Sequence, residues 1–474
     1  MAQTITIKGV TRIEGHAQIT IELNDDGSVR DAQFHVTQFR GFESFVQGRP
    51  LPEMPGIMAR ICGICPVSHL MASSKACDDI LAVELPPAAV KLRRIMNLAQ
   101  LVQSHALSFF HLSSPDLIYG MDSNPASRNI FNLAASHPDF ALDGIMLRKF
   151  GQEIIGLLGG KKIHPAWVVP GGVSAPLAAP HRDAILASIP EALERIGRGL
   201  DRFHAVQDNY PAEADAFANF PTMFAGLSNP DGTLEHYDGT LRFVDEHARL
   251  VAELSAPREY PQFIGEAVED FTFLKFPYFL PRGYPAGIYR VGPLARLVIA
   301  ERCGTPLADR ELGLFRSRLG RAPQSSFHYH WARLIEILYG IEMIRRLLEE
   351  PDILSDHVRA RARPNRFEGV GISEAPRGTL IHHYKIDRNG LMTWANMIIA
   401  TGHNNLAMNR GVRQVAERFV DGRKLREGML NRVEAVIRCF DPCLSCSTHA
   451  LGTMPLRITL QGADGEVYDV LTRN

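Results

Sequence analysis

The segment R-I-C-G-I-C-P-V-S-H at residues 60–69 decides how this chain must fold, because it has a counterpart near the other end. That counterpart is D-P-C-L-S-C-S-T-H at residues 441–449, and each segment contains one Cys-x-x-Cys pair. If all four thiolates bind one metal, the first and the last tenth of the chain must meet. Thiolate ligands favour zinc, nickel, copper(I) and iron clusters over magnesium or calcium. The two segments therefore predict a soft-metal site where the chain ends meet.

The composition indicates a globular protein without a nucleic-acid partner. The 51 Lys and Arg residues nearly cancel the 52 Asp and Glu residues, so the basic excess that nucleic acids or anionic membranes attract is missing. No run approaches the roughly 18 apolar residues that predict a membrane span. The start M-A-Q-T-I-T-I-K-G-V does not resemble a secretory signal, and we expect a cytoplasmic location.

Periodicity predicts a mainly helical chain with peripheral β-hairpins. Alternation over 4–38, interrupted by a turn at 24–27, predicts antiparallel strands. Apolar residues at helical spacing predict helices at 66–84, 87–112, 139–158, 182–208, 326–349, 403–418 and 424–439. Strand-turn-strand units are expected at 366–398, around 388–390, and at 455–472, around 463–465. Because there is no linker or repeat, we expect one large helical-core domain of the α+β class.

Two ordinary metal sites compete for the cysteine pairs. Structural zinc modules usually place their pairs about 15–20 residues apart, whereas positions 65 and 443 lie 378 residues apart. A ferredoxin-like iron–sulfur run is absent, because the other cysteines stand alone in sequence. These three, Cys77, Cys303 and Cys439, are expected to be inert buried thiols. Arg60 and Asp441 flank the pairs and are expected to balance the charge of a thiolate-rich centre.

The paired signatures resemble those of the large subunit of [NiFe] hydrogenases. The likeness covers nearly the whole chain, and within the family it is greatest to the soluble, bidirectional, NAD-coupled branch. The motifs that carry it are T-R-I-E-G-H (11–16), F-R-G-F-E (39–43), G-K-K-I-H-P (160–165), V-P-G-G-V (169–173) and E-A-P-R-G-T-L-I-H-H-Y (374–384).

The resemblance implies a bimetallic centre held by the four cysteines. Cys62, Cys65, Cys443 and Cys446 would bind nickel, and Cys65 and Cys446 would also bridge to an iron that carries carbon monoxide and cyanide. Splitting dihydrogen heterolytically needs a Lewis-acidic metal and a base that takes the proton. A thiolate bound only to nickel, Cys443, can serve as that base.

Further site residues follow from the same resemblance. Glu14 would relay protons from the site, although T-R-I-E-G-H alone indicates a strand with Arg12, Glu14 and His16 on one face as a surface ion cluster. Arg377 would place its guanidinium over the metals, supported by Asp441.

A second metal site and one departure from the family complete the implied set. Glu43 and His449 would bind a structural magnesium ion; an exposed glutamate and a loop histidine are the ordinary alternatives. Many family members carry an aspartate where this chain has Ser104, so an acid-dependent role is not expected there.

Electrons must leave through other chains, because no further cysteine cluster remains here and no G-x-G-x-x-G dinucleotide fingerprint follows a strand. The resemblance implies a small subunit with an iron–sulfur cluster, and diaphorase subunits that hold flavin and NAD. It also implies that a maturation endopeptidase removes residues 450–474, which leaves a catalytic domain at 1–449. The alternatives are a sulfur- or heterodisulfide-linked hydrogenase, a non-catalytic scaffold like the related Complex I subunit, and a structural zinc protein.

Overall fold

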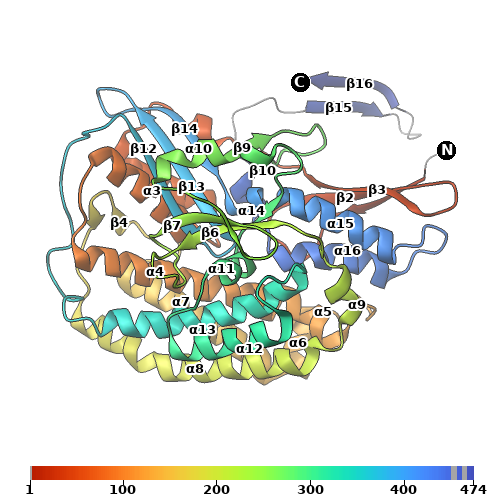
Figure 1. The fold of residues 1–474 in the computed structure, drawn as a ribbon, viewed down its shortest axis with the longest axis horizontal. Helices are drawn as coiled ribbons and strands as arrows, with labels where there is room; N and C mark the ends of the chain where they lie inside the picture. Colours follow the sequence, from red (N-terminus) through yellow and green to blue (C-terminus); the bar gives the residue numbers. More distant parts are fainter. Residues whose placement is uncertain (1–2, 450–455, 462–466, 474) are drawn as a thin grey trace.

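The computed structural model describes residues 3–449, 456–461 and 467–473, and the side chains of residues 3–449. A layer of long helices lies below a smaller region of sheets and short helices (Figure 1). The helices are α1 (Phe42–Phe45), α2 (Met54–Met58), α3 (Pro66–Leu81), α4 (Pro87–Ala106), α5 (Ser114–Tyr119), α6 (Ile130–Ser136), α7 (Pro138–Gly159), α8 (Ala179–Gln207), α9 (Pro211–Ala216), α10 (Tyr260–Phe263), α11 (Pro293–Ile299), α12 (Pro306–Leu319), α13 (Tyr329–Leu348), α14 (Ala400–His403), α15 (Asn405–Phe419), α16 (Glu427–Phe440) and α17 (Leu444–Ser447).

The strands form small sheets rather than one large one. Their order is β1-β2-β3, β4-β5, β11-β6-β7-β8, β10-β9, β12-β13-β14 and β15-β16. Their bounds are β1 (Gln3–Lys8), β2 (Ala17–Leu23), β3 (Val29–Val36), β4 (Val168–Val169), β5 (Gly172–Val173), β6 (Met223–Ser228), β7 (Thr240–Val244), β8 (Leu250–Glu253), β9 (Ile264–Ala267), β10 (Phe276–Phe279), β11 (Tyr289–Arg290), β12 (Glu368–Ala375), β13 (Gly378–Ile386), β14 (Met392–Ile398), β15 (Leu456–Gln461) and β16 (Val467–Arg473).

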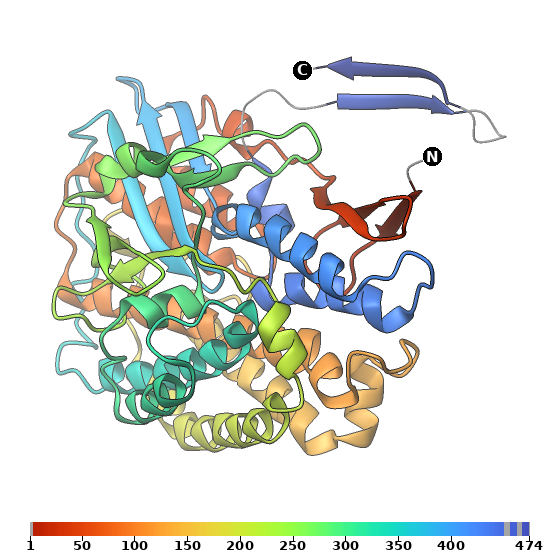
Figure 2. The ribbon, with the colours of Figure 1, turned by 45° about the vertical axis from the view of Figure 1, so that its right-hand side comes forward.

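The expected fold class, a helical core with small sheets, is confirmed. Helices α4, α7, α8 and α13 pack against one another in the lower layer (Figures 1 and 2). Gly151 of α7 permits the close approach to α4, since a Cβ there would lie 2.3 Å from the carbonyl oxygen of Ala99. Proline occupies the first turn of α3, α4, α7, α8, α11 and α12, where its missing N–H costs no helical hydrogen bond.

The expected elements differ from the structure in three places. The helix expected to reach residue 112 continues past Ala106 as a π-turn, Leu107–Ser113. The helix expected at 403–418 is divided between α14 and α15. The sheet of β6, β7, β8 and β11 was not expected, because its strands are short and β6 is buried throughout, without alternation.

The unit expected at 366–398 has three strands, not two, and it is not peripheral. The turn at 388–390 is present, but Pro376 and Arg377 make a second tight turn between β12 and β13. All residues of β13 except Lys385 are buried. The sheet packs on α3, so its turns lie inside the molecule.

The C-terminal strand pair expected at 455–472 is present as β15 and β16. In both views it is drawn outside the main body (Figures 1 and 2). Its turn at 463–465 lies outside the described residues. In the described part of the chain, no helix combines the length and apolar composition needed to cross a bilayer.

Candidate metal centre

The first cysteine pair lies where a short 3₁₀ turn gives way to a long helix. Cys62 is extended after the turn at Ala59–Ile61, and Cys65 immediately precedes α3, which starts at Pro66. The backbone N–H groups of Ile64 and Cys65 both donate to Cys62 Sγ, each at 3.2 Å. These two hydrogen bonds favour a negative charge on that sulfur.

The second pair is placed by the end of α16. Asp441 caps this helix in the left-handed conformation, with φ 51°, and so turns the chain toward α17. Cys443 precedes α17 and Cys446 lies within it. Thr401 Oγ1 accepts a hydrogen bond from Cys443 N at 2.9 Å, which fixes the start of α17 against α14.

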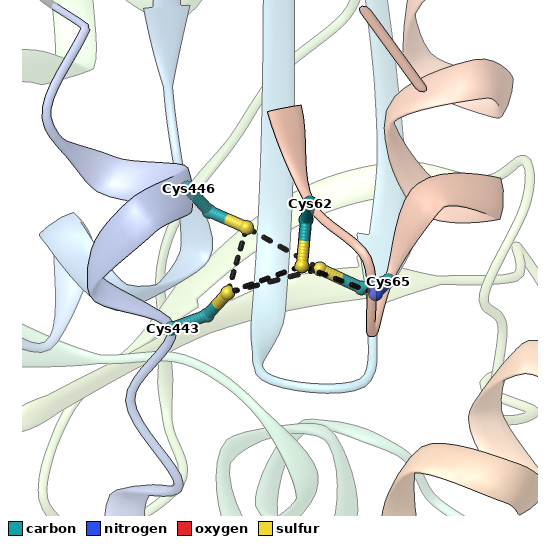
Figure 3. Close-up of side chains that lie close together, drawn as sticks. All are labelled: Cys62, Cys65, Cys443 and Cys446. Carbon is teal, nitrogen blue, oxygen red and sulfur yellow. Dashed lines mark hydrogen bonds between the residues drawn. The ribbon is translucent and has the colours of Figure 1, made fainter. Parts of the chain in front are cut away.

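The four sulfur atoms meet in one buried space (Figure 3). Cys62 Sγ lies 3.4 Å from Cys443 Sγ, and Cys65 Sγ lies 3.4 Å from Cys446 Sγ. All four lie within 4.8 Å of one another, and each cysteine is at most 4% exposed. Within the described residues, no other group of three or more His, Cys, Asp or Glu side chains converges in this way. The expectation that both chain ends build one site is confirmed.

The protonation of the sulfurs fits a cation site. Hydrogen bonds from Cys443, Cys446 and Cys65 hold the pKa of Cys62 well below its usual range. Burial raises the pKa of Cys443 and Cys446 well above theirs. Since thiolate is the form that ligates, a soft cation that binds here displaces the remaining protons. The donor set, all sulfur and fully enclosed, therefore fits a nickel or iron centre.

Arg377 lies at the two-residue turn between β12 and β13, beside this cluster. Its Nε donates to the carbonyl oxygen of Asp441 at 2.6 Å, and its Nη2 to Asp441 Oδ1 at 3.2 Å. Nη1 donates to Ser104 Oγ at 3.4 Å. Burial opposes its charge, yet Asp441 and the cysteine sulfurs hold the pKa of Arg377 well above its usual range. The expected contact with Asp441 is present.

Glu14 lies against the second cysteine segment, although not on a strand. Its residue forms an isolated parallel bridge to Cys443, its Oε2 accepts from Ser445 N at 3.0 Å, and its carbonyl accepts from Leu444 N at 3.2 Å. Gly15, with φ 90°, permits this approach, because a Cβ there would lie 2.7 Å from Leu444 Cβ. The expectation of a strand over 11–16 is wrong: the segment is a loop shaped by its contact with α17.

Glu43 and His449, the expected magnesium ligands, are both buried and adjacent. The N–H of Glu43 donates to the carbonyl oxygen of His449 at 3.4 Å, and Glu43 Oε1 accepts from Met397 N at 2.8 Å. Burial lowers the pKa of His449 to about 3, so its ring is neutral. Its Nε2 is buried and has no hydrogen-bond partner among the described residues, which fits a ligand role. Magnesium binding stays a prediction.

Two expectations about neighbouring charges have opposite outcomes. Arg60 is exposed, so the expectation that it balances the centre is wrong; Arg40, which sequence reasoning missed, donates instead to the carbonyl oxygen of Ile61. Cys77, Cys303 and Cys439 are buried, and burial raises their pKa, that of Cys439 to about 12. They are the buried thiols that were expected.

Other groups near the centre also escaped sequence reasoning. His69 Nδ1 lies 3.2 Å from His382 Nε2, and His382 Nδ1 lies 2.6 Å from Tyr384 Oη. Their signal was the H-H-Y run at 382–384, within a motif chosen for Arg377. Alternation on β13 places residues 382 and 384 on one face, toward α3.

Comparisons with known proteins agree with this geometry. A family model described as nickel-dependent hydrogenase matches residues 40–137 and 241–449, and a second, described as HoxL-like, matches residues 4–39. The NAD-reducing hydrogenase HoxS subunit beta of Cupriavidus necator is 42% identical, with both chains covered completely. The matching vhu subunit of the F420-non-reducing hydrogenase of Methanococcus voltae is 41% identical over 87% of this chain and 98% of its own.

Solved structures give the same result. The crystal structure of an NAD⁺-reducing [NiFe]-hydrogenase in the H2-reduced state superposes with a TM-score of 0.91 at 42% identity, covering 94% of this chain and 99% of that one. A Ni-Fe-Se hydrogenase from D. vulgaris Hildenborough shares the fold, with a TM-score of 0.77 at 23% identity over 95% of this chain and 100% of that one. With four converging cysteines and a family model that covers most of its length, this chain belongs to the nickel-dependent hydrogenase family.

Proposed function

We propose that this chain is the catalytic large subunit of a bidirectional, NAD-coupled [NiFe] hydrogenase. The observation that carries the proposal is the meeting of four buried sulfurs from the two chain ends beside a buried guanidinium. The relative of highest identity reported above is named an NAD-reducing hydrogenase, which favours NAD as the final acceptor.

The cysteines hold the centre and one of them handles the proton. Cys62, Cys65, Cys443 and Cys446 bind nickel, and Cys65 and Cys446 also contact the iron. Bound there, a nickel–iron centre with carbon monoxide and cyanide on iron supplies the Lewis acid that polarises dihydrogen. Cys443 Sγ accepts the proton released by heterolytic cleavage. The closed pocket excludes water, which strengthens each charge interaction within it.

Glu14 and Arg377 complete the chemistry of the chain itself. The Glu14 carboxylate is half-buried and hydrogen-bonded next to Cys443 and Cys446, which suits a group that takes the proton from Cys443 and passes it outward. Arg377 holds a fixed positive charge beside the sulfurs, and Asp441 sets the direction of its guanidinium.

Electrons leave through partner chains in this proposal. Cys77, Cys303 and Cys439 are buried thiols that form no cluster with one another among the described residues. An iron–sulfur small subunit takes the electrons, and diaphorase subunits with flavin pass them to NAD. Glu43 and His449 bind magnesium, and a maturation endopeptidase removes residues 450–474 after His449.

Metal analysis and infrared spectroscopy of the purified complex test the centre. We expect nickel and iron together, with infrared bands from carbon monoxide and cyanide; zinc alone would make the chain a structural zinc protein. Hydrogen-dependent reduction of NAD⁺ tests the acceptor, with viologen dye as a control for the centre itself. Reduction of the dye without NAD⁺ would favour a sulfur- or heterodisulfide-linked enzyme. Mass spectrometry should find a chain that ends at His449, and a full-length active chain would contradict processing.

A further inference from the structure

A buried charge network lies behind the turn that carries Arg377. Arg296 of α11 donates Nε and Nη2 to the two carboxylate oxygens of Glu336 in α13, at 2.6 and 2.7 Å. Its Nη1 donates to Glu374 Oε2 in β12 at 2.7 Å. All three side chains are 0% exposed. A guanidinium held by a two-point contact to one carboxylate and a third contact to another has a single orientation.

The same guanidinium also binds the backbone of the turn. Arg296 Nη1 donates to the carbonyl oxygen of Ala375 at 3.0 Å, and Nη2 donates to that of Pro376 at 3.2 Å. These are the two residues that immediately precede Arg377. The turn is also packed from this side, because a Cβ on Gly292 would lie 2.8 Å from the carbonyl oxygen of Arg377.

The carboxylates that hold Arg296 are themselves fixed. Glu336 accepts from His105 Nε2 at 2.8 Å and lies 3.2 Å from His236 Nε2. Glu374 Oε1 accepts from Thr379 Oγ1 at 2.8 Å and from Leu227 N at 3.0 Å. The network therefore joins α4, α11, α13 and the β12–β13 turn into one rigid support.

On the other side, the Arg377 guanidinium has only one charged hydrogen-bond partner among the described residues. Asp441 accepts from it through a carbonyl and a carboxylate oxygen, whereas the contact to Ser104 is neutral and 3.4 Å long. The side chain thus depends on the position of its own backbone. A shift of the turn moves the guanidinium relative to the four sulfurs.

We propose that Arg296 is a positioning residue that fixes the Arg377 guanidinium over the metal centre by holding the carbonyls of Ala375 and Pro376. The role toward the centre rests on the proposed function, whereas the effect on the position of Arg377 does not. Lysine at 296 keeps the positive charge but has no planar fork, so it cannot serve two carboxylates and two carbonyls together.

The test is Arg296→Lys in the complete complex, with Arg290→Lys as the matched control. Arg290 is equally buried and also donates to backbone carbonyls, those of Ala218, Phe220 and Gln324, but it has no hydrogen bond to the Arg377 turn. Arg296→Lys is expected to shift the cyanide infrared bands and to lower kcat about tenfold to a hundredfold at unchanged metal content. Arg290→Lys is expected to leave bands and kcat as in the parent. Parent-like bands and kcat in Arg296→Lys overturn the proposal.

A crystal structure of Arg296→Lys separates this proposal from the proposed function. The Arg377 guanidinium is expected to lose a contact to Asp441, and an unmoved Arg377 overturns the positioning role whatever metal is bound. Absence of the infrared bands from the parent complex would refute the hydrogenase centre instead. If Arg296→Lys does not fold, Glu374→Gln takes its place, because it keeps the shape of the network and removes one orienting charge. The same displacement and band shift are expected, and their absence overturns the proposal.

Discussion

Thiolate character is confined to the cysteines that face Arg377 and one another. Hydrogen bonds from its neighbours lower the pKa of Cys62, whereas Cys77, on the helix that follows Cys65, has its pKa raised well above the usual range by burial. Burial alone therefore leaves a thiol inert, and only the combination of several sulfurs and a guanidinium makes a metal site.

Replacing one bridging cysteine should abolish metal binding. Cys65→Ser removes a soft ligand from a four-sulfur set, so we expect loss of nickel and iron from the purified chain, measured by elemental analysis. Cys77→Ala is the control, because Cys77 lies on α3 and contacts no cluster sulfur by hydrogen bond among the described residues. Retention of both metals in Cys65→Ser would show that this sulfur is not a required ligand.

Replacing the proposed proton relay should slow turnover without removing the metals. Glu14→Gln keeps the contact to Ser445 N but cannot carry a proton as a carboxylate does, so kcat is expected to fall about a hundredfold or more. Metal content and infrared bands should stay unchanged. Glu22→Gln, on the exposed pair with Arg30, is the control and should keep full activity. Full activity in Glu14→Gln would place the proton path elsewhere.

At the scale of elements, the close approach of β12 to α3 places the Arg377 turn beside the cysteines. A Cβ on Gly371 would lie 2.1 Å from the carbonyl oxygen of Ala72, and one on Gly369 would lie 2.4 Å from that of Ala76. Two residues without side chains thus let a strand lie directly on a helix backbone. The end of β12 then reaches the start of α3, where Cys65 lies.

Adding one methyl group at this contact should separate the two elements. Gly371→Ala places its Cβ against backbone, which cannot move aside as a side chain can, so a destabilisation of about 3 kcal/mol is expected. Thermal unfolding and metal content measure the effect. Gly197→Ala in α8 is the control: nothing lies within 4 Å of its Cβ, and a gain of about 0.5–1 kcal/mol is expected. An unchanged unfolding temperature in Gly371→Ala would contradict the close packing.

At the scale of the whole molecule, the core contains histidines that are held neutral. Burial lowers the pKa of His105, His330 and His403 to about 3, and that of His69 to about 4. In the unfolded chain these rings titrate near 6.5. The unfolded chain therefore binds more protons than the folded one once the pH falls below 6.5.

Mild acid should destabilise the fold. The contribution of these histidines is fully present above pH 6.5 and is lost as the pH falls toward their folded values, about 1.4 kcal/mol per pH unit for each ring. Thermal unfolding at pH 7.5 and 5.5 measures the loss. His330→Gln should reduce the slope of stability against pH, whereas exchange of the exposed His357 should not. Equal slopes in both variants would contradict the neutral state of His330.

Local patterns in the sequence determined the helices, the cysteine pairs and the contact motifs. Helices α3, α4, α7, α8, α13 and α16 follow from apolar spacing, because a helix that covers a core shows its buried face as a 3.6-residue period. The extra turn at Pro376 and Arg377 was missed, since strands buried on both faces do not alternate. Arg40 and the Arg296 network were missed because a buried arginine has no local signature.

By itself, the sequence determined that the chain carries two thiolate pairs, a helical core and the signatures of a hydrogenase large subunit. Only the tertiary structure decided that the four sulfurs meet, that Arg60 faces outward while Arg377 is buried, and that Arg296 holds the turn behind it. The physical reason is distance along the chain. Periods and caps arise from residues a few positions apart, whereas a metal site joins residues hundreds of positions apart and depends on how all the elements pack.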